Sequence, residues 1–212
     1  VSTSADDLGL SGGQAILAAM RGTGKIATLI VPANHAWEDA TESSGTLSMP
    51  DKETVTESII EQAAALIKNS KRTALLLGGP ALHETALEAA GRIARACGVR
   101  VLNETFPARL QRGAGRFVPE RLQYFSEHTT AQLDGLEQLL LVGAQAPVSF
   151  FAYPGKESWL VPEGCDVFEL GTVDHDLQLA LETLAARCDA FEPAVTATAS
   201  PELPAPTGDL TP

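Results

Sequence analysis

Two adjacent glycines, Gly78 and Gly79, have a residue type and a position in the sequence that suit the binding of a phosphorylated ligand. They directly follow a short apolar run over residues 73–77, which has the composition of a buried strand. Glycines at the end of such a strand let backbone N–H groups and the start of the next helix approach an anion. The segment lacks a GxGxxG pattern, however, and Pro80 removes one donor. A tight strand-to-helix turn without a ligand is therefore the favoured alternative.

Arginines in the segment 109–116 are a second candidate, because they lie among glycines after another predicted strand. Guanidinium groups bind phosphate oxygens in pairs, so Arg112 and Arg116 could clamp a diphosphate at the carboxyl edge of a sheet. A solvated loop that offsets the acidic surface, or a contact with a neighbouring subunit, explains them equally well. We therefore predict Gly78, Gly79, Arg112 and Arg116 as the cofactor-binding residues to test.

The segment 146–156 is a third candidate, since it holds three of the few aromatic residues of the chain, Phe150, Phe151 and Tyr153. Aromatic side chains on a loop form either the wall of a ligand site or the anchors of an interface. The sequence favours an interface anchor, and ordinary packing of a loop is the alternative.

No group of residues has the pattern of a catalytic or metal centre. The run 174–176, Asp-His-Asp, has the residue types of an acid–base site, but consecutive residues at a helix start point in different directions, so we predict a helix cap. The four histidines lack ligand spacing, and the three cysteines lie far apart. Cys97 and Cys188 each end an apolar helical pattern, which predicts buried free thiols in a reducing cytoplasm. We expect no catalytic residue and no metal ligand in this chain.

Apolar strands that alternate with helical patterns must position these candidates. The sequence predicts strands over residues 73–77, 99–102, 139–142 and 166–170. It predicts one helix that is capped by Asp51 or Thr54 and ends near residue 67, and others over residues 82–97, 126–138 and 174–188, the first of these closed by Gly98. Such alternation is typical of βαβ units and a buried parallel sheet. We therefore expect an α/β fold over residues 54–190, with a Rossmann-like, doubly wound, mostly parallel sheet and helices on both faces.

The two ends of the sequence have a different character. Residues 14–20 predict a short helix and residues 26–31 a strand, which together form one αβ unit that is too small to bury both faces of a strand. Residues 38–53 predict a linker, and residues 191–212, rich in Pro, Ala and Thr, predict a second, semi-extended linker without a core. The sequence also opens on Val1 without an initiator methionine. We therefore expect a piece of a longer protein.

The charge and composition of the sequence exclude several classes of protein. Its 212 residues include 27 acidic and 15 basic side chains, which give a net charge of −12. Nucleic-acid binding needs a basic face, so we expect no nucleic-acid partner. No apolar run approaches the roughly 20 residues of a membrane-spanning helix, so we expect no membrane span. With 44% hydrophobic residues, the chain can form a folded core.

Five stretches of the sequence, taken together in their order and spacing, resemble one family of enzymes. They are residues 26–33, 73–79, 108–116, 139–144 and 150–155. From Gly13 to about Leu184, the sequence resembles the thiamine-diphosphate-dependent enzymes of the acetolactate synthase, benzoylformate decarboxylase and pyruvate oxidase group. Among these it is most similar to bacterial acetolactate synthase large subunit-like proteins. The resemblance depends on all five stretches, since none is diagnostic by itself.

The resemblance implies a parent protein with three α/β domains. Residues 1–37 resemble the C-terminal end of a pyrimidine-binding domain, residues 38–53 a linker, residues 54–190 the central Rossmann-like domain, and residues 191–212 the link to a diphosphate-binding domain. The family decarboxylates a 2-oxo acid with thiamine diphosphate and Mg²⁺, and some members then transfer the product to a second carbonyl compound. The glutamate and the Gly-Asp-Gly…Asn motif that this chemistry requires are not found in the sequence. The resemblance therefore implies that these sites lie outside the chain and that the chain alone is inactive.

The central domain of this family binds FAD in some members, ADP in others, and no nucleotide in the rest. Flavin-binding members carry arginine after the strand that corresponds to residues 139–142, where this sequence has Gln145-Ala-Pro-Val-Ser-Phe150. This difference favours a central domain without FAD or ADP. The resemblance also implies a cytoplasmic homo-oligomer, a dimer or a tetramer, in contact with the remaining domains of the parent chain. A free-standing module that binds FAD, NAD or ADP, or that mediates oligomerisation, is the alternative.

Overall fold

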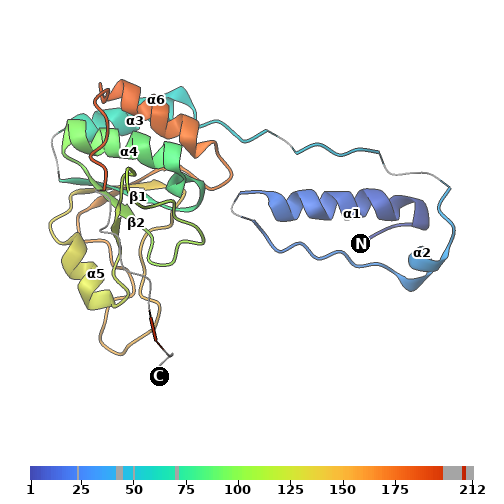
Figure 1. Cartoon of the computed structure of the whole chain (residues 1–212). Coiled ribbons are helices and arrows are strands. Elements are labelled where there is room, and N and C mark those ends of the chain that lie inside the picture. The colour runs from blue at the N-terminus through green and yellow to red at the C-terminus, as the bar shows by residue number, and fades with distance from the viewer. Residues whose placement is uncertain (23, 42–44, 50, 70–71, 198–206, 209–212) are drawn as a thin grey trace.

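A five-stranded, all-parallel β-sheet forms the centre of the domain on the left of Figure 1. The computed structural model describes residues 1–22, 24–41, 45–49, 51–69, 72–197 and 207–208. The strands are β1 (Thr73–Leu77), β2 (Arg100–Asn103), β3 (Glu120–Arg121), β4 (Gln138–Val142) and β5 (Asp166–Gly171). They lie in the order β3-β2-β1-β4-β5, so the chain winds outward from β1 in both directions. This order confirms the predicted Rossmann-like, doubly wound sheet.

Helices cover both faces of the sheet, as the sequence predicts. α3 (Glu57–Lys68), α4 (Glu84–Cys97) and α6 (Leu177–Arg187) pack on one face, and α5 (Ser126–Leu133) lies on the other (Figure 1). β1 directs Leu75 and Leu77 into the core beneath the three helices, and it directs Ala74 and Leu76 into the core on the side of α5. Because β1 and β4 are buried on both faces, the sequence of β1 is continuously apolar after Thr73 and that of β4 after Gln138.

The run 174–176 confirms the predicted helix cap. The side chain of Asp176 accepts a hydrogen bond from the N–H of Leu179 at 3.1 Å and caps α6. Asp174 instead forms an ion pair with Lys25 at 2.9 Å. The ring of His175 accepts a backbone hydrogen bond at 3.1 Å within its own turn. The three consecutive side chains thus have three different partners, which is a helix start and not an acid–base site.

Several predicted boundaries differ from the observed ones. α3 begins after Thr56, so neither Asp51 nor Thr54 is its cap. α4 begins at residue 84, because a short 3-10 turn (Gly79–Leu82) follows β1, and Gly98 closes it at a φ of 70° as predicted. α5 ends at residue 133, because Gly135 adopts a φ of 73° and residue 138 already begins β4. The two-residue strand β3 has no counterpart in the sequence prediction.

The N-terminal residues form a helical unit that stands apart from the sheet (Figure 1). α1 (Ala5–Met20) begins well before the predicted helix, because Ser4 caps it by accepting a hydrogen bond from the N–H of Asp7 at 3.1 Å. α2 (Ala33–Trp37) is a short helix that the sequence does not predict. The predicted strand over residues 26–31 is wrong for this chain. A strand needs a hydrogen-bonded neighbour, and none of the described residues pairs with this segment as a strand.

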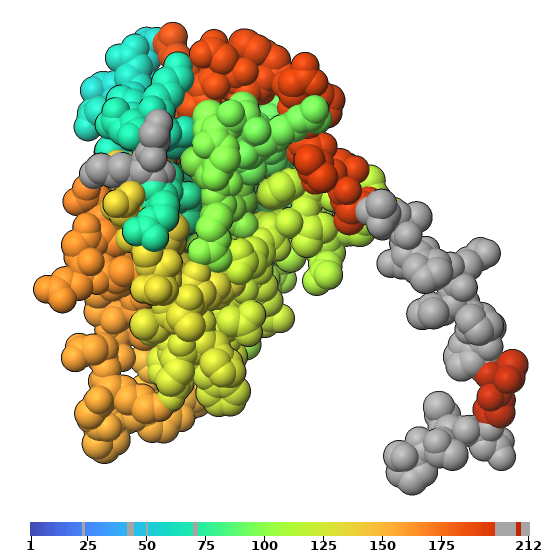
Figure 2. Space-filling model, turned by 90° about the vertical axis from the view of Figure 1, so that its left-hand side faces the viewer, coloured from blue at the N-terminus to red at the C-terminus, as the bar shows by residue number. Residues whose placement is uncertain are grey.

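The first residues of the predicted second linker, 191–197, pack onto α4. Ala194 is only 7% exposed, and Arg95 donates a hydrogen bond to the backbone of this segment at 2.9 Å. Backbone hydrogen bonds at 2.9 and 3.0 Å join Ala197 to the loop at 115–116. Figure 2 shows this segment, in red, against the green residues of α4. These residues therefore pack against the sheet domain, whereas most of the remaining tail (198–206 and 209–212) lies outside the described residues.

Candidate functional site

The strands β1 and β4 are neighbours from which the chain winds in opposite directions, and doubly wound sheets bind ligands at such a switch point. Gly78 follows β1 and Gly143 follows β4. The N–H of Gly78 donates a hydrogen bond to the carbonyl of Val142 at 3.0 Å. A Cβ atom at Gly78 would lie 2.6 Å from the oxygen of Gly143, and one at Gly143 would lie 2.7 Å from the oxygen of Gly78. The close approach of two backbones therefore explains both glycines without a ligand.

A cavity of about 490 Å³ opens at this end of the sheet. It is lined by residues at the ends of β1 and β4, including Gly79 and Gly143, and by the aromatic side chains of Phe106, Tyr124 and Phe150. Its volume lies within the range of small-molecule sites, roughly 300–1,000 Å³. The fold and the cavity together make this the candidate binding site of the chain.

Three aromatic rings form one wall of the cavity. Tyr124 and Phe150 are stacked, with ring centroids 5.7 Å apart and planes at 15°. Phe106 contacts them at 5.7 and 5.1 Å, respectively. The three residues are 40–59% exposed, so part of the wall remains accessible to a ligand. The structure thus divides the aromatic segment 146–156: Phe150 faces the cavity, and the interface role predicted for the segment stays a prediction.

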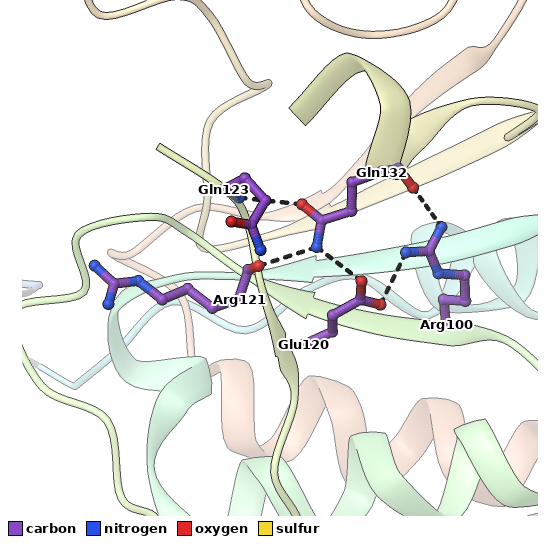
Figure 3. A network of polar contacts seen from close by, with 5 residues as sticks. All are labelled: Arg100, Glu120, Arg121, Gln123 and Gln132. Atoms are coloured by element: carbon purple, nitrogen blue, oxygen red, sulfur yellow. Dashed lines mark hydrogen bonds and ion pairs between the residues drawn. The ribbon is translucent and has the colours of Figure 1, made fainter. Parts of the chain in front are cut away.

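A polar network holds the segment after β3 against α5 and β2 (Figure 3). The Gln132 amide donates hydrogen bonds to the Glu120 carboxylate at 2.8 Å and to the carbonyl of Arg121 at 2.9 Å. Its oxygen accepts from the N–H of Gln123 at 3.1 Å. Arg100 donates to the carbonyl of Gln132 at 2.7 Å and to Glu120 at 2.8 Å. Burial raises the pKa of Glu120, but the hydrogen bonds and the charge of Arg100 outweigh it and lower the pKa overall.

Glu104 supplies the negative charge of the cavity. It follows β2 directly, and its own N–H donates a hydrogen bond to the carbonyl of Leu77 at 3.2 Å, at the end of β1. Half-burial raises the pKa of this carboxyl group, and the nearby backbone N–H of Gly79 only partly offsets that effect. Sequence reasoning missed Glu104, although it follows the predicted strand 99–102, where doubly wound folds often carry an acidic residue that contacts a ribose.

The predicted arginines do not reach this cavity. Arg116 forms an ion pair with Glu84 at 3.0 Å, at the start of α4, and lines a separate cavity there. Arg112 is exposed on the same loop. The structure therefore brings Gly78 and Gly79 together at the switch point and places the two arginines apart from them. Cofactor binding by these four residues stays a prediction.

A diphosphate group, as in FAD or ADP, does not fit the charges of the cavity. No Lys or Arg is among the described residues that line it, and the N–H of Gly79 already faces a carboxylate. The guanidinium of Arg121 packs over the ring of Phe106 at 5.9 Å and donates a hydrogen bond to the carbonyl of Thr105 at 2.7 Å. It is therefore engaged with the wall and does not supply a phosphate clamp inside the cavity.

The described residues contain no group of three His, Cys, Asp or Glu side chains placed to hold a metal ion. Among the helices of the described residues, none has the length and apolar character needed to cross a membrane. Cys97, Cys165 and Cys188 are free thiols; of the two predicted to be buried, Cys188 is buried and Cys97 is only partly buried. Cys97 is half-buried beside the buried Cys188, with its sulfur 3.9 Å from the carbonyl oxygen of Cys188. Burial, together with the neighbouring Cys97, raises the pKa of the Cys188 thiol to about 12, so it is a neutral packing group.

Comparison with known proteins adds a sequence relative. No family model matches the chain. Over 202 residues the sequence is 42% identical to IlvX of Mycobacterium tuberculosis, a protein named as an acetolactate synthase large subunit. The match covers 93% of this chain and 38% of that protein.

Solved structures with the same fold agree with this relative. A thiamin diphosphate-dependent enzyme from Mycobacterium smegmatis matches with a TM-score of 0.67 and 20% identity, over 91% of this chain and 40% of that one. The 4-hydroxybenzoylformate decarboxylase of Rhodococcus jostii matches with a TM-score of 0.58 and 18% identity, over 99% and 41%. Benzoylformate decarboxylase of Polynucleobacter necessarius matches with a TM-score of 0.63 and 17% identity, over 86% and 37%.

The sequence relative and the shared fold confirm the resemblance of this sequence to thiamine-diphosphate-dependent enzymes. In sequence the chain is similar to IlvX, which is named as an acetolactate synthase large subunit. It spans 38% of the length of IlvX and 37–41% of the length of the three solved structures.

Proposed function

We propose that this chain is the central portion of a thiamine-diphosphate-dependent 2-oxo acid decarboxylase or carboligase that resembles acetolactate synthase. The observation that carries this proposal is the match to IlvX, which covers 93% of this chain and 38% of the relative. In this role, residues 54–190 form the central Rossmann-like domain, residues 1–37 are the end of a pyrimidine-binding domain, and residues 38–53 and 191–212 connect the domains.

The exposed apolar surface of the N-terminal unit supports a place within a larger protein. None of the side chains of α1 is buried, and Ile16 and Met20 are 62% and 59% exposed. In the segment that follows, Ile26 is 100% exposed and Ile30 is 59% exposed. Apolar surface of this extent is typical of an interface. In the proposed parent, the remaining domains cover it.

The chain has a structural role in this proposal and is inactive alone. Thiamine diphosphate, with Mg²⁺, supplies the decarboxylation chemistry of the superfamily, and residues of the parent protein outside this chain hold both. The chain in turn sets the distance between the domains on either side of it. The parent is a cytoplasmic homo-oligomer, a dimer or a tetramer.

The test compares the 212-residue chain with the product of the complete open reading frame. Each is incubated with thiamine diphosphate, Mg²⁺ and a panel of 2-oxo acids, and the release of carbon dioxide is measured. We expect release from the complete protein and none from the chain. Turnover by the chain alone would contradict its structural role. An open reading frame without an upstream glutamate domain or a downstream Gly-Asp-Gly…Asn motif would contradict the whole proposal.

A free-standing binding or oligomerisation module is the second candidate. The cavity at the switch point favours a binding module, and the exposed rings of Phe151 and Tyr153, at 54% and 49%, favour an oligomerisation module. Calorimetric titration of the chain with FAD, NAD and ADP tests the first role, and light scattering tests the second. Absence of heat and a monomeric mass would remove this candidate.

A further inference from the structure

The charge of the switch-point cavity is opposite to the charge that a nucleotide diphosphate requires. Glu104 is the only Asp, Glu, Lys, Arg or His among the described residues that line the cavity. Its carboxylate faces the N–H of Gly79, a donor that a phosphate oxygen would need at this position. Two anions next to one donor in a half-buried site repel each other strongly. The cavity therefore disfavours the diphosphate by charge as well as by the lack of an arginine.

The main chain fixes Glu104 at this position. Its N–H donates a hydrogen bond to the carbonyl of Leu77 at 3.2 Å, and its carbonyl accepts one from the side chain of Asn103 at 2.7 Å. Asn103 is fully buried, so this second contact is part of the core. With its backbone bonded on both sides, Glu104 keeps its side chain at the cavity.

The remaining lining suits a planar ligand that donates hydrogen bonds. The stacked residues Tyr124 and Phe150 are 40% and 50% exposed, and an aromatic ring of a ligand can pack against the accessible part of this pair. Gln123 and Gln145 also line the cavity and add neutral polar groups. A carboxylate accepts hydrogen bonds from hydroxyl and amino groups, and such charge-assisted bonds are about twice as strong as neutral ones.

We propose that this cavity binds a planar, phosphate-free ligand of the chemical class of a nucleoside. The hydroxyl or amino groups of the ligand donate to the Glu104 carboxylate, its ring packs on Tyr124 and Phe150, and Glu104 excludes the corresponding nucleotide. This preference is a property of the chain itself and holds whatever reaction the parent protein catalyses.

Adenosine and ADP are a suitable pair of probes, because they differ only in the diphosphate. Each is titrated into the full 212-residue chain by calorimetry, with FAD as a third probe. We expect adenosine to bind at least about tenfold more tightly than ADP or FAD. In Glu104→Gln, adenosine should bind more weakly and ADP more tightly, so that their ratio falls to about threefold or less. Tyr124→Leu should weaken both probes by the same factor, and Glu61→Gln, which removes an exposed carboxylate of α3, should change neither.

The comparison in the wild-type chain decides the proposal even if a variant fails to fold. ADP or FAD binding as tightly as adenosine would overturn it, and so would absence of adenosine binding. For variants whose circular dichroism shows a native fold, an unchanged ratio of adenosine to ADP affinity in Glu104→Gln would overturn the role of the carboxylate.

Discussion

At the scale of single residues, two glycines share a backbone conformation but differ in their surroundings. Gly143 has a φ of 67° and Gly155 a φ of 73°. A Cβ atom at Gly143 would lie 2.4 Å from the side chain of Leu177, whereas one at Gly155 would meet open space. Gly155→Ala should therefore cost the left-handed backbone penalty alone, about 1–2 kcal/mol. Gly143→Ala adds a clash at the switch point and should cost roughly 3 kcal/mol or more.

Urea denaturation of the wild-type chain and the two variants measures this difference in the free energy of unfolding. Gly155→Ala is the matched control, because it changes the same residue type at nearly the same φ. Equal losses would mean that β4 moves away from β1 at low cost. The close backbone approach would then not explain the glycine at position 143.

The half-buried carboxyl group of Glu104 makes stability depend on pH. Burial raises its pKa in the folded chain, so between the ordinary and the raised pKa the folded state binds more protons than the unfolded state. The ionised side chain therefore destabilises the fold at neutral pH, and this effect disappears as the pH falls below the ordinary carboxyl pKa. Glu104→Gln should raise the free energy of unfolding by about 0.5 kcal/mol at neutral pH. In acid, the variant and the wild type should be equally stable.

Denaturant titrations at neutral and acid pH measure how the effect of Glu104→Gln on the free energy of unfolding changes with pH. Glu61→Gln is the control for loss of an exposed carboxylate. An advantage of Glu104→Gln that grows on acidification would mean that the backbone N–H of Gly79 outweighs burial. The carboxylate would then stabilise the fold in its ionised form.

At the scale of secondary-structure elements, side chains hold the short strand β3 in place. It has two residues and pairs only with β2. Gln132→Ala removes the hydrogen bonds of its amide to Glu120, Arg121 and Gln123. We expect a loss of about 1–2 kcal/mol in the free energy of unfolding. We also expect faster hydrogen exchange at Gln123, whose N–H loses its acceptor.

Hydrogen exchange with residue resolution measures this effect, and Gln178→Ala is the control. Gln178 lies exposed on α6, where its amide bonds Glu182 at 3.3 Å. The control should leave exchange at Gln123 unchanged. If Gln132→Ala also leaves it unchanged, the segment is held by its backbone contacts and the network of Figure 3 has no structural role.

The strands show what composition can and cannot predict. β1 and β4 could be predicted almost to the residue, because both are buried on two faces and are therefore continuously apolar after their first residue. β3 could not be predicted, since Glu120 and Arg121 are polar and form a strand only through their pairing with β2. Residues 26–31 are the opposite case, because they have the composition of a strand but pair with no strand among the described residues. Composition thus identifies the strands that are buried on both faces. For other segments, pairing with a neighbouring strand decides whether a strand forms.

At the scale of the whole molecule, the location of the site could be predicted and its chemistry could not. The alternation of strands and helices puts Gly78 and Gly79 at the switch point. The arginine loop was expected at the same edge, but it packs on the start of α4, where the N–H of Gln111 donates to the carbonyl of Leu82 at 3.1 Å. The aromatic wall comes from separate segments of the chain. Local patterns do not encode such long-range placement, which is why the sequence points to Phe150 but not to Glu104, Phe106 and Tyr124.

The exposed apolar surface of the N-terminal unit leads us to expect that the isolated chain associates with copies of itself. Ile26 and Trp37 are 100% and 83% exposed, and the backbone of the segment 26–31 is not paired in a sheet. An apolar segment of this kind offers a template for pairing between chains. The double substitution Ile26→Lys with Ile30→Lys should keep the fold, because neither side chain is buried, and should lower the average mass in solution.

Sedimentation velocity over a concentration series measures that mass. The matched variant is Phe151→Ser in the aromatic segment 146–156, the other exposed apolar surface, where Phe151 is 54% exposed. If only Phe151→Ser lowers the mass, the aromatic segment 146–156 is the interface, and the N-terminal unit does not drive association. A wild-type chain that stays monomeric throughout the series would contradict both. Apolar contact by the exposed isoleucines would then be too weak to hold a second copy of the chain. A covalently linked domain of the parent would be the favoured partner, because linkage raises its effective concentration.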